Sequence, residues 1–365
     1  MNRIATRDAQ AGSPAPAGPG AVIGLLGPTG VGKTTVAVEL ARRLLGTWPP
    51  SRTRHAAVPA GPGAVGRVVS CDSMQVYRGF PVLTNQPAVE EARGIAHALV
   101  GFVDPGEDFS LSEYAQRARP LVEEDLLSQG WALIVGGTGL YMRAALAPLA
   151  VAPIGDREVR ARLEARAASE GPHVLHAELA RLDPKAAEAI DPRNTRRLIR
   201  ALESVGVTGR PWSGRSDLWA PVYDHPTLLV GLLAEREMLY RRIDTRATRI
   251  VRGGAVEEVR RFRAERGLEE TCPGGPGIRS AIGYPEICRF LDGRQALEET
   301  VAQVATATRG YARRQLTWLR KLGDAVIIDA QDRSPGELAE EILALARSGD
   351  HTTWPGDHTM EPHHS

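Results

Sequence analysis

The sequence predicts an α/β fold: a parallel sheet flanked by helices, with a helical subdomain inserted into it. Short apolar runs recur along the chain, and each ends in a loop that contains Gly or Asp. Segments with helical spacing of apolar residues follow these runs, and from about residue 153 to 206 the pattern is helical throughout. Strands of a parallel sheet are buried on both faces and therefore apolar throughout, and ligands bind at their carboxyl ends.

The N-terminal half is expected to begin with a strand and a helix that are joined by a glycine-rich loop. Ala21–Leu26 is an apolar run that ends in Gly-Pro, and apolar residues at helical spacing follow in Lys33–Leu45. Residues 46–66 are rich in Pro, Gly and Arg and predict a surface loop. Two further buried strands are expected at Arg67–Ser70 and Trp131–Val135.

The C-terminal half is expected to be mostly helical, with two strands that complete the sheet. Those strands are the apolar runs Thr227–Leu233 and Val326–Asp329. Amphipathic spacing predicts the helices, which are expected at Arg157–Ser169, His173–Leu182, Arg236–Ala264, Leu297–Lys321 and Ser334–Arg347.

These patterns divide the chain into five regions. Residues 1–20, rich in Ala, Gly and Pro, and the polar residues 348–365 are expected to be disordered, because they cannot bury enough apolar surface. Residues 21–150 are expected to form the first part of the core and residues 151–206 the inserted helical subdomain. Residues 207–347 would then complete the core with arginine-rich helices.

The composition excludes several classes of protein. The formal net charge is +1, so attraction to nucleic acid or membrane cannot come from the overall charge and requires local clusters. No run of about 18 apolar residues and no signal peptide is found, so we expect a cytoplasmic protein without a membrane segment. The three cysteines have no spacing that indicates a disulfide framework or a zinc site.

One loop matches the phosphate-binding pattern G-x-x-x-x-G-K-[ST], and it lies between an expected strand and an expected helix. It consists of Gly27, Pro28, Thr29, Gly30, Val31, Gly32, Lys33 and Thr34. In such a loop the backbone N–H groups and the helix N-terminus bind phosphate oxygens, the lysine adds a positive charge, and the last hydroxyl binds Mg²⁺ or phosphate. The loop therefore predicts a P-loop NTPase-like core.

The motif alone leaves the reaction open. ATP or GTP hydrolysis and phosphoryl transfer by a small kinase both use this loop, usually with a strand that ends in an Asp that holds Mg²⁺. The strand Trp131–Val135 ends instead in Gly136-Gly137-Thr138-Gly139, although Asp72 does follow the strand Arg67–Ser70. A kinase therefore remains an alternative at this point.

Six ordered blocks between about residues 21 and 330 resemble the tRNA dimethylallyltransferase family. They are GPTGVGKT at 27–34, CDSMQVYRG at 71–79, VGGTGLY at 135–141, NTRRLIRALE at 194–203, AIGYPE at 281–286 and RRQLTWLRK at 313–321. The resemblance implies transfer of a dimethylallyl group from dimethylallyl diphosphate to N6 of an adenosine, with release of diphosphate. The implied acceptor is the adenosine 3′-adjacent to the anticodon (tRNA position 37) in tRNAs that read codons beginning with U.

The resemblance implies that Asp72, Thr34 and Arg246 are catalytic. An adenine amino group is a poor nucleophile, so a base must accept its proton as the new bond forms, and we expect Asp72 to be that base. Alternatives for Asp72 are a cap on the next helix or a ligand of Mg²⁺, the one expected cofactor, which Thr34 is also expected to hold.

The diphosphate is expected to be bound by the whole P-loop together with Arg242 and Arg246. These two arginines lie in the pattern R-I-x-x-R, and donors aimed at a group that gains charge in the transition state lower the barrier. The alternative is that both arginines belong to a solvated face of their helix.

The tRNA anticodon stem-loop is the expected partner of a chain that acts as a monomer. An adenine in an RNA loop must be turned out of the loop before a buried proton acceptor can reach its N6. Gln75 is expected to hydrogen-bond to the edge of this adenine. Trp318 would either stack on RNA or lie in the core. The residues that the resemblance assigns to tRNA are Asp72, Ser73, Met74, Gln75, Thr138, Arg160, Arg196, Arg197, Arg200, Arg279, Arg313, Arg314, Gln315, Trp318 and Arg320.

The sequence departs from the usual bacterial pattern of the family at three places. It has Leu83-Thr84-Asn85-Gln86-Pro87 after the Asp-Ser block, Ala98 within the His-His-Leu pattern, and Ser280 where an arginine is common. These departures keep three alternatives open: an adenylate dimethylallyltransferase that makes cytokinin from free nucleotide, a P-loop kinase or NTPase, and a non-catalytic RNA-binding module.

Overall fold

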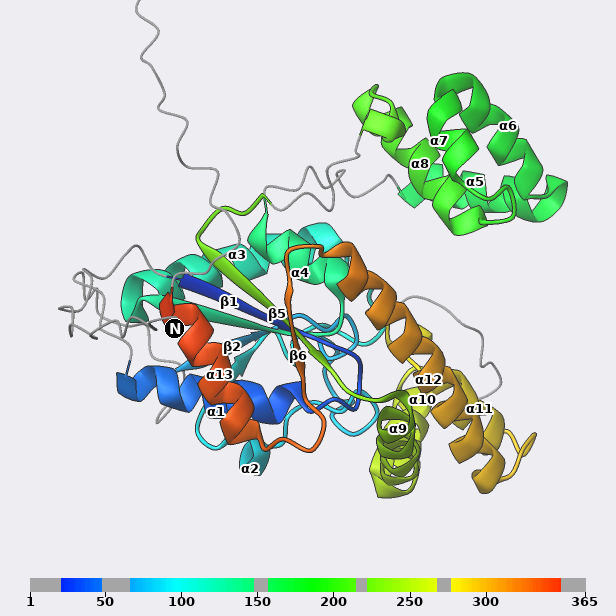
Figure 1. Cartoon of the computed structure of the whole chain (residues 1–365). Helices are drawn as coiled ribbons and strands as arrows, with labels where there is room; N and C mark the ends of the chain where they lie inside the picture. Colours follow the sequence, from blue (N-terminus) through cyan, green and yellow to red (C-terminus); the bar gives the residue numbers. More distant parts are fainter. Residues whose placement is uncertain (1–20, 48–65, 148–156, 215–221, 268–276, 349–365) are drawn as a thin grey trace, which may run out of the picture.

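The described part of the chain folds around one parallel sheet. The computed structural model describes residues 21–47, 66–147, 157–214, 222–267 and 277–348. The sheet has six strands in the order β3-β2-β4-β1-β5-β6, every pair parallel, with helices on both faces (Figure 1). The predicted α/β fold with a parallel sheet flanked by helices is therefore confirmed. Residues 1–20 and 349–365, expected to be disordered, lie outside the described residues, as does most of the expected loop 46–66.

All five predicted strands are present, and the structure adds one at the edge. The strands are β1 Ala21–Leu26, β2 Arg67–Ser70, β3 Ala96–Ala98, β4 Trp131–Gly136, β5 Thr227–Leu233 and β6 Val326–Asp329. Every residue of β1 and β4 is buried, as expected for central strands. The additional strand β3 is only half-buried and reads Ala-His-Ala, so no apolar run marks it.

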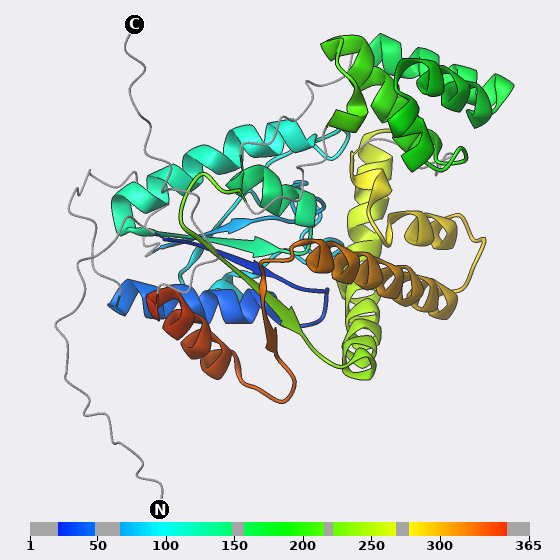
Figure 2. The same cartoon turned by 45° about the horizontal axis from the view of Figure 1, so that its top comes forward.

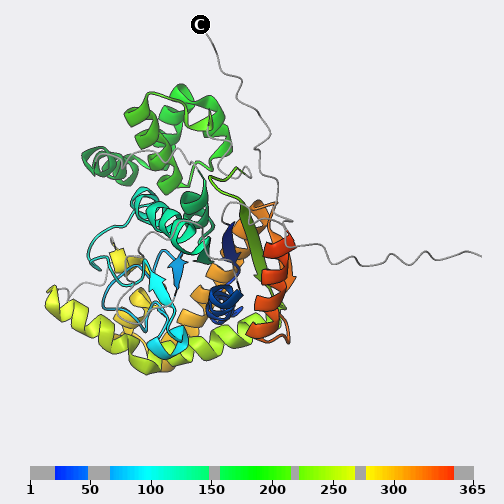
Figure 3. The same cartoon turned by 90° about the vertical axis from the view of Figure 1, so that its left-hand side faces the viewer.

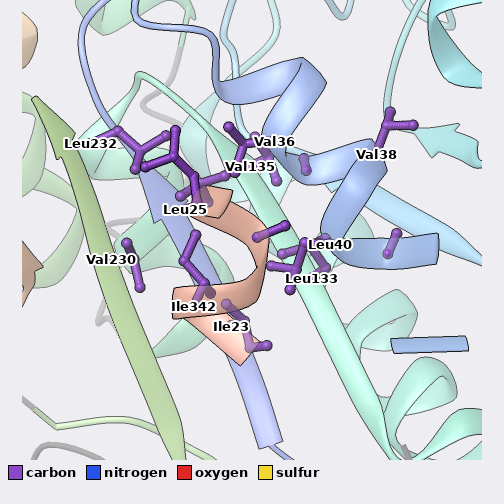
Figure 4. Packing of buried hydrophobic residues seen from close by; sticks show 14 of the residues in the cluster. Ile23, Leu25, Val36, Val38, Leu40, Leu133, Val135, Val230, Leu232 and Ile342 are labelled. Carbon is purple, nitrogen blue, oxygen red and sulfur yellow. The ribbon is translucent and has the colours of Figure 1, made fainter. Parts of the chain in front are cut away.

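Helices cover the two faces of the sheet and form two separate apolar layers. On one face, α1 (Lys33–Thr47) and α13 (Pro335–Ser348) pack on Ile23, Leu25 and Val230 (Figure 4). On the other face lie α3 (Leu111–Gln129) and α4 (Gly139–Leu146), which bury Tyr114 and Met142 completely. Each such side chain contributes roughly 1.5–3 kcal/mol on burial. The two layers fix the carboxyl ends of the central strands in space.

Long helices lie beyond that carboxyl edge. They are α9 (Arg236–Ile250), α10 (Val256–Glu265), α11 (Tyr284–Leu291) and α12 (Leu297–Lys321). The prediction of one continuous helix over Arg236–Ala264 is wrong, because the π-helical segment η3 (Val251–Ala255) interrupts it, with Gly254 at φ 129°. The adjacent glycines at 253 and 254 disfavour regular helix and permit this backbone conformation. Of two further short elements, α2 (Val89–Ala92) lies against α1 and η4 (Gly277–Ser280) against α11.

Four helices between β4 and β5 form a unit with its own core. They are α5 (Arg157–Glu170), α6 (Pro172–Leu182), α7 (Pro184–Ala189) and α8 (Thr195–Thr208), followed by the turn η1 (Trp212–Gly214). Their buried cluster, with Leu175, Leu179 and Leu198 at its centre, contains no residue from the rest of the described chain. Figures 2 and 3 show these green helices to one side of the sheet.

Two expectations from composition can be compared with the structure. Among the described residues, no helix is both long enough and apolar enough to cross a membrane. Cys71 is a buried free thiol, whereas Cys288 is disulfide-bonded, which the cysteine spacing did not indicate.

Candidate active site

The P-loop forms the floor of a site at the carboxyl edge of the sheet. It follows β1 and leads into α1, which begins at Lys33. Gly30 and Gly32 have φ values of 88° and 99°, a backbone conformation that residues with side chains rarely adopt. This conformation makes the tight turn from the strand into the helix N-terminus, the geometry that binds phosphate groups.

Lys33 is folded back over this loop. Its Nζ donates a hydrogen bond to the backbone oxygen of Pro28 at 2.8 Å. Burial lowers the pKa of Lys33 to about 8, with Asp72 opposing the shift and Arg246 adding to it. Three charged groups from distant parts of the chain therefore lie close together here. An anionic ligand would stabilise the protonated form of Lys33.

Asp72 lies directly after β2, the strand next to β4. Its Oδ1 accepts the backbone N–H of Met74 at 2.9 Å, so one oxygen closes a local turn. Among the described residues, no protein group is hydrogen-bonded to the other oxygen. The carboxylate thus combines a fixed position with an oxygen that can accept a proton or bind a ligand.

Helix α9 brings two arginines over the P-loop. Arg242 donates to the backbone oxygen of Gly30 at 3.4 Å, and its side chain is otherwise exposed. Arg246, one turn further, is partly buried, and burial lowers its pKa while the carboxylate of Asp72 raises it. Arg246 therefore faces the same space as Asp72 and Lys33, whereas Arg242 lies at its rim.

Thr138 and Gln315, both expected to contact substrate RNA, are buried side chains with partners in the protein. Thr138 immediately precedes α4, and its hydroxyl accepts the N–H of Ser73 at 3.4 Å. Gln315 is 4% exposed and accepts the N–H of Thr29 in the P-loop at 2.7 Å. The structure thus places the Gln315 side chain against the P-loop, away from the exposed arginines of its helix.

The loop between β2 and β3 is held by Gln75 and by two side chains of the long helices that the sequence did not single out. Gln75 accepts a hydrogen bond from Ser70 at 3.0 Å and donates to the backbone of Asn85 at 2.8 Å, so its amide is already engaged. Glu258 of α10 accepts the N–H groups of residues 82 and 83, both at 2.8 Å. Arg249 donates to the Asn85 side chain at 3.0 Å. The residues that depart from the usual bacterial pattern thus bind the long helices.

The arginines of the α5–α8 unit fall into two groups. Arg160 makes a bidentate pair with the buried Glu203 at 2.9 and 3.2 Å, and Arg200 lies 3.7 Å from the same carboxylate. Arg196 and Arg197, at the start of α8, are exposed, and their guanidinium groups have no protein partner among the described residues. Arg160, expected to contact RNA, is therefore tied to its own subdomain, while Arg196 and Arg197 face solvent.

Helix α12 presents a second set of cations. Arg313, Arg314 and Arg320 are exposed, whereas Trp318 is half-buried with its ring edge-on to Tyr311 at 6.1 Å. Arg279, in η4, is half-buried and close enough to Tyr284 to lower its pKa, which burial otherwise raises. The expected RNA residues on α12 thus divide between an exposed arginine face and a buried face.

A metal ion at this edge would need ligand atoms from a bound phosphate compound in addition to protein side chains. Among the described residues, no group of three His, Cys, Asp or Glu side chains could hold a metal ion. Mg²⁺ that is bound chiefly through phosphate oxygens needs only one or two protein ligands. The Thr34 hydroxyl has no hydrogen-bond partner in the described part of the chain, unlike Thr35, which donates to Gly32 at 2.8 Å. Thr34, with Asp72 at the same edge, fits such a role.

Known proteins resemble this chain over most of its length. Residues 75–322 match the family described as IPP transferase. A tRNA dimethylallyltransferase of Thermomicrobium roseum is 41% identical over 302 residues, which cover 82% of this chain and 84% of that protein. One of Thermobifida fusca is 39% identical over 300 residues, covering 82% and 87%.

Solved structures agree with these sequence relatives. The full-length tRNA isopentenylpyrophosphate transferase of Bacillus halodurans has a TM-score of 0.62 at 34% identity, covering 90% of this chain and 96% of that one. A eukaryotic dimethylallyltransferase acting on tRNA has a TM-score of 0.73 at 26% identity, covering 91% and 79%. The chain belongs to the IPP transferase family.

Proposed function

We propose that the protein is a tRNA dimethylallyltransferase, which transfers the dimethylallyl group of dimethylallyl diphosphate to N6 of the adenosine 3′-adjacent to the anticodon. The observation that carries the proposal is the convergence of Lys33, Asp72 and Arg246 at the P-loop, where Asp72 and Arg246 both affect the pKa of Lys33 and Asp72 also affects that of Arg246. A phosphate cradle beside a carboxylate suits a reaction that expels diphosphate and removes a proton. Membership of the family supplies the class of substrate.

The phosphate side of the site binds the leaving group. As the C1–O bond of dimethylallyl diphosphate breaks, negative charge grows on the diphosphate, and the P-loop N–H groups, Lys33 and Arg246 bind that charge more strongly in the transition state than in the ground state. Arg242, at the rim, adds a weaker contact. The phosphorus–oxygen bonds stay intact, so no phosphoryl group is transferred.

Asp72, on the other side of the site, accounts for the proton that the reaction releases. As the new N6–C1 bond forms, N6 of adenine loses one proton, and the free oxygen of Asp72 accepts it. Thr138 lies next to this loop and is placed to donate a hydrogen bond to substrate. The products are the dimethylallylated adenosine, diphosphate and one proton.

We further propose that Mg²⁺ assists this reaction when it is bound to the diphosphate, where it supplies additional positive charge for the leaving group. Thr34 is the residue that would hold it. Asp72 and the remaining residues named here act on the substrates directly.

The exposed arginines are proposed to bind the tRNA. Arg196 and Arg197 on α8, and Arg313, Arg314 and Arg320 on α12, can neutralise phosphates without first breaking an internal ion pair. Both helices belong to the blocks that resemble the RNA-contacting segments of the family. We propose that tRNAs reading codons that begin with U are the substrates, and that the chain acts as a cytoplasmic monomer.

Incubation with labelled dimethylallyl diphosphate and competing acceptors tests the proposal. The acceptors are unmodified tRNA transcripts with A37, the same transcripts with G37, and AMP, ADP and ATP. We expect label in the A37 transcript and none in the remaining acceptors. Label in the mononucleotides alone would instead identify an adenylate dimethylallyltransferase.

A kinase and an RNA-binding module would give different outcomes in the same reactions. A P-loop kinase or NTPase would turn over ATP and leave the isoprenoid untouched. A non-catalytic RNA-binding module would retain tRNA on a filter without attaching any label. Either result would contradict the proposed function.

A further inference from the structure

A chain of neighbouring polar groups joins the P-loop to the loop that follows β2. The backbone N–H of Thr29 donates to Oε1 of Gln315 at 2.7 Å, and the amide of Gln315 lies beside the hydroxyl of Tyr311. That hydroxyl lies 3.2 Å from Oγ1 of Thr138. The same Oγ1 accepts the backbone N–H of Ser73 at 3.4 Å. Ser73 follows the expected base directly in sequence, so the chain connects the two halves of the site.

The direction of these hydrogen bonds follows from the groups that have only one role. A backbone N–H can only donate, so Gln315 presents its oxygen to the P-loop and its NH₂ group to Tyr311. Either hydroxyl could donate in the Tyr311–Thr138 pair, and the NH₂ group of Gln315 beside the Tyr311 oxygen favours Tyr311 as the donor to Thr138. Burial raises the pKa of Tyr311, so the hydroxyl keeps that hydrogen.

The consequence falls on the hydroxyl of Thr138. It accepts one hydrogen bond from Ser73 and one from Tyr311, which occupies both of its lone pairs. Its own hydrogen is therefore left to donate to a third group. The hydroxyl lies at the carboxyl edge of β4, beside the loop that carries Asp72, where a substrate atom would take that role.

The amide of Gln315 packs directly against Gly137. A Cβ atom on Gly137 would lie 1.8 Å from Nε2 of Gln315, so a side chain at position 137 would displace this amide. Gln315 and Tyr311 are one helical turn apart on α12 and therefore share a face. Exposed Arg314 stacks with its guanidinium carbon 5.5 Å from the centre of the Tyr311 ring, so the arginine surface of α12 contacts this chain.

We propose that Gln315 and Tyr311 are positioning residues for the transfer reaction. Gln315 holds the P-loop through Thr29, and Tyr311 orients the Thr138 hydroxyl as a donor next to Asp72. Both side chains act through other residues. The proposal rests on the function proposed above, because it requires diphosphate at the P-loop and an acceptor base near Asp72.

Steady-state kinetics of two single variants and their double variant test this proposal. Tyr311→Phe removes one hydroxyl, and we expect kcat to fall about tenfold with the Kd for tRNA unchanged. Gln315→Leu removes both the contact with Tyr311 and the hydrogen bond to the P-loop. We therefore expect a similar fall in kcat together with about tenfold weaker binding of inorganic diphosphate. Because both residues act through one chain, the double variant should lose no more than the worse single variant.

A matched control separates positioning from general loss of stability. Tyr223→Phe removes another buried tyrosine hydroxyl, which donates to Asp324 away from the site. We expect its Tm to fall as much as that of Tyr311→Phe, with kcat unchanged. Values of kcat for Tyr311→Phe and Gln315→Leu within about twofold of the wild type, or losses that multiply in the double variant, would overturn the proposal.

Failure of this proposal can be distinguished from failure of the proposed function. If the wild-type protein attaches no dimethylallyl group to tRNA, the proposed function is wrong. Calorimetry with inorganic diphosphate then still tests the Gln315 contact, since Gln315→Leu is expected to bind it more weakly than the wild type and Tyr223→Phe equally well. Equal affinity of Gln315→Leu and the wild type would contradict the contact.

Discussion

The carboxyl edge of the sheet and the arginine-bearing helices differ in how their polar side chains are held. At the edge, Thr138 and Gln315 are buried and hydrogen-bonded before any ligand arrives. On α8 and α12, by contrast, Arg196 and Arg313 extend into solvent. Under the proposed function, the edge is preorganised for one small reacting group, and the helices offer positive charge to the tRNA. Changes at the edge should alter catalysis in large steps, whereas changes on the helices should alter binding in small, salt-dependent ones.

The largest effect is expected for Asp72→Asn. The amide cannot accept the N6 proton, so we expect kcat to fall about 10²–10⁴-fold. The Asx-type hydrogen bond to Met74 can be kept by the amide oxygen, so the fold and the Kd for tRNA should stay near wild type. Quenched-flow transfer and filter binding measure the two quantities. Unchanged turnover would remove Asp72 from the role of base.

Three arginines of α9 provide a graded comparison within one helix. Arg246→Ala should lower kcat/KM for dimethylallyl diphosphate about 10²–10³-fold, because this substitution removes a charge directed at the leaving group. Arg242→Ala should have a smaller effect, since that side chain lies at the rim and, within the described chain, contacts Gly30 through one long hydrogen bond.

Arg241→Ala serves as the neutral control for this series. Arg241 is exposed, and its pair with Glu237 at 3.9 Å is a surface interaction of little consequence for stability. We expect wild-type kinetics from it. Equal reductions in all three variants would mean that α9 contributes only general positive charge and no directed contact.

The pH dependence follows from the lowered pKa of Lys33. In the free protein the lysine is protonated below pH 8 and neutral well above it, whereas bound diphosphate favours the ammonium form. Affinity for dimethylallyl diphosphate should therefore be constant below pH 8 and weaken above it, by up to about tenfold per pH unit. The free protein should change in the opposite sense, gaining stability from about pH 8 towards 10.5 as the cost of the buried charge disappears.

Calorimetry across pH with Lys33→Ala as the control measures this effect. The variant lacks the titrating group, so its weaker binding should show no break at pH 8. A wild-type affinity that stays flat up to pH 10 would contradict the role given to Lys33.

The smallest effects are expected on α8. Replacing Arg196 and Arg197 together by Ala should weaken tRNA binding a few-fold and reduce the slope of log Kd against log salt by about 0.7–0.9 for each phosphate that these arginines neutralise in the wild type. At saturating tRNA, kcat should be unchanged. Arg181→Ala, an exposed arginine on α6 of the same unit, should leave the slope as it is. An unchanged slope in the Arg196/Arg197 variant would mean that these two arginines do not contact tRNA phosphates.

Sequence patterns predicted the parts of the molecule that depend on local periodicity. The apolar strands and the P-loop are found where expected, because burial on both faces and the glycine-rich turn leave direct marks in the sequence. Strand β3 left no mark, since an edge strand needs few apolar residues. The π-helical interruption at Gly254 could have been suspected from the two adjacent glycines.

Contacts between distant segments account for what was missed at the site. Gln315 and Thr29 are 286 positions apart, and Glu258 binds a loop about 175 positions away. No pattern in either segment shows that they meet. The one available hint was the spacing of Tyr311 and Gln315, four residues apart on a helix with an arginine-rich opposite face. Tertiary packing decides which side of such a helix meets the P-loop.

The central claim is that the P-loop binds a departing diphosphate and transfers no phosphoryl group. Dimethylallyl diphosphate that carries a heavy oxygen isotope in the bridge between C1 and phosphorus tests it directly, with mass spectrometry of both products after reaction with an A37 transcript. We predict that all of the isotope appears in the released diphosphate and that one diphosphate forms for each modified adenosine. Isotope retained on the isoprenoid carbon, or a requirement for ATP hydrolysis, would contradict this account.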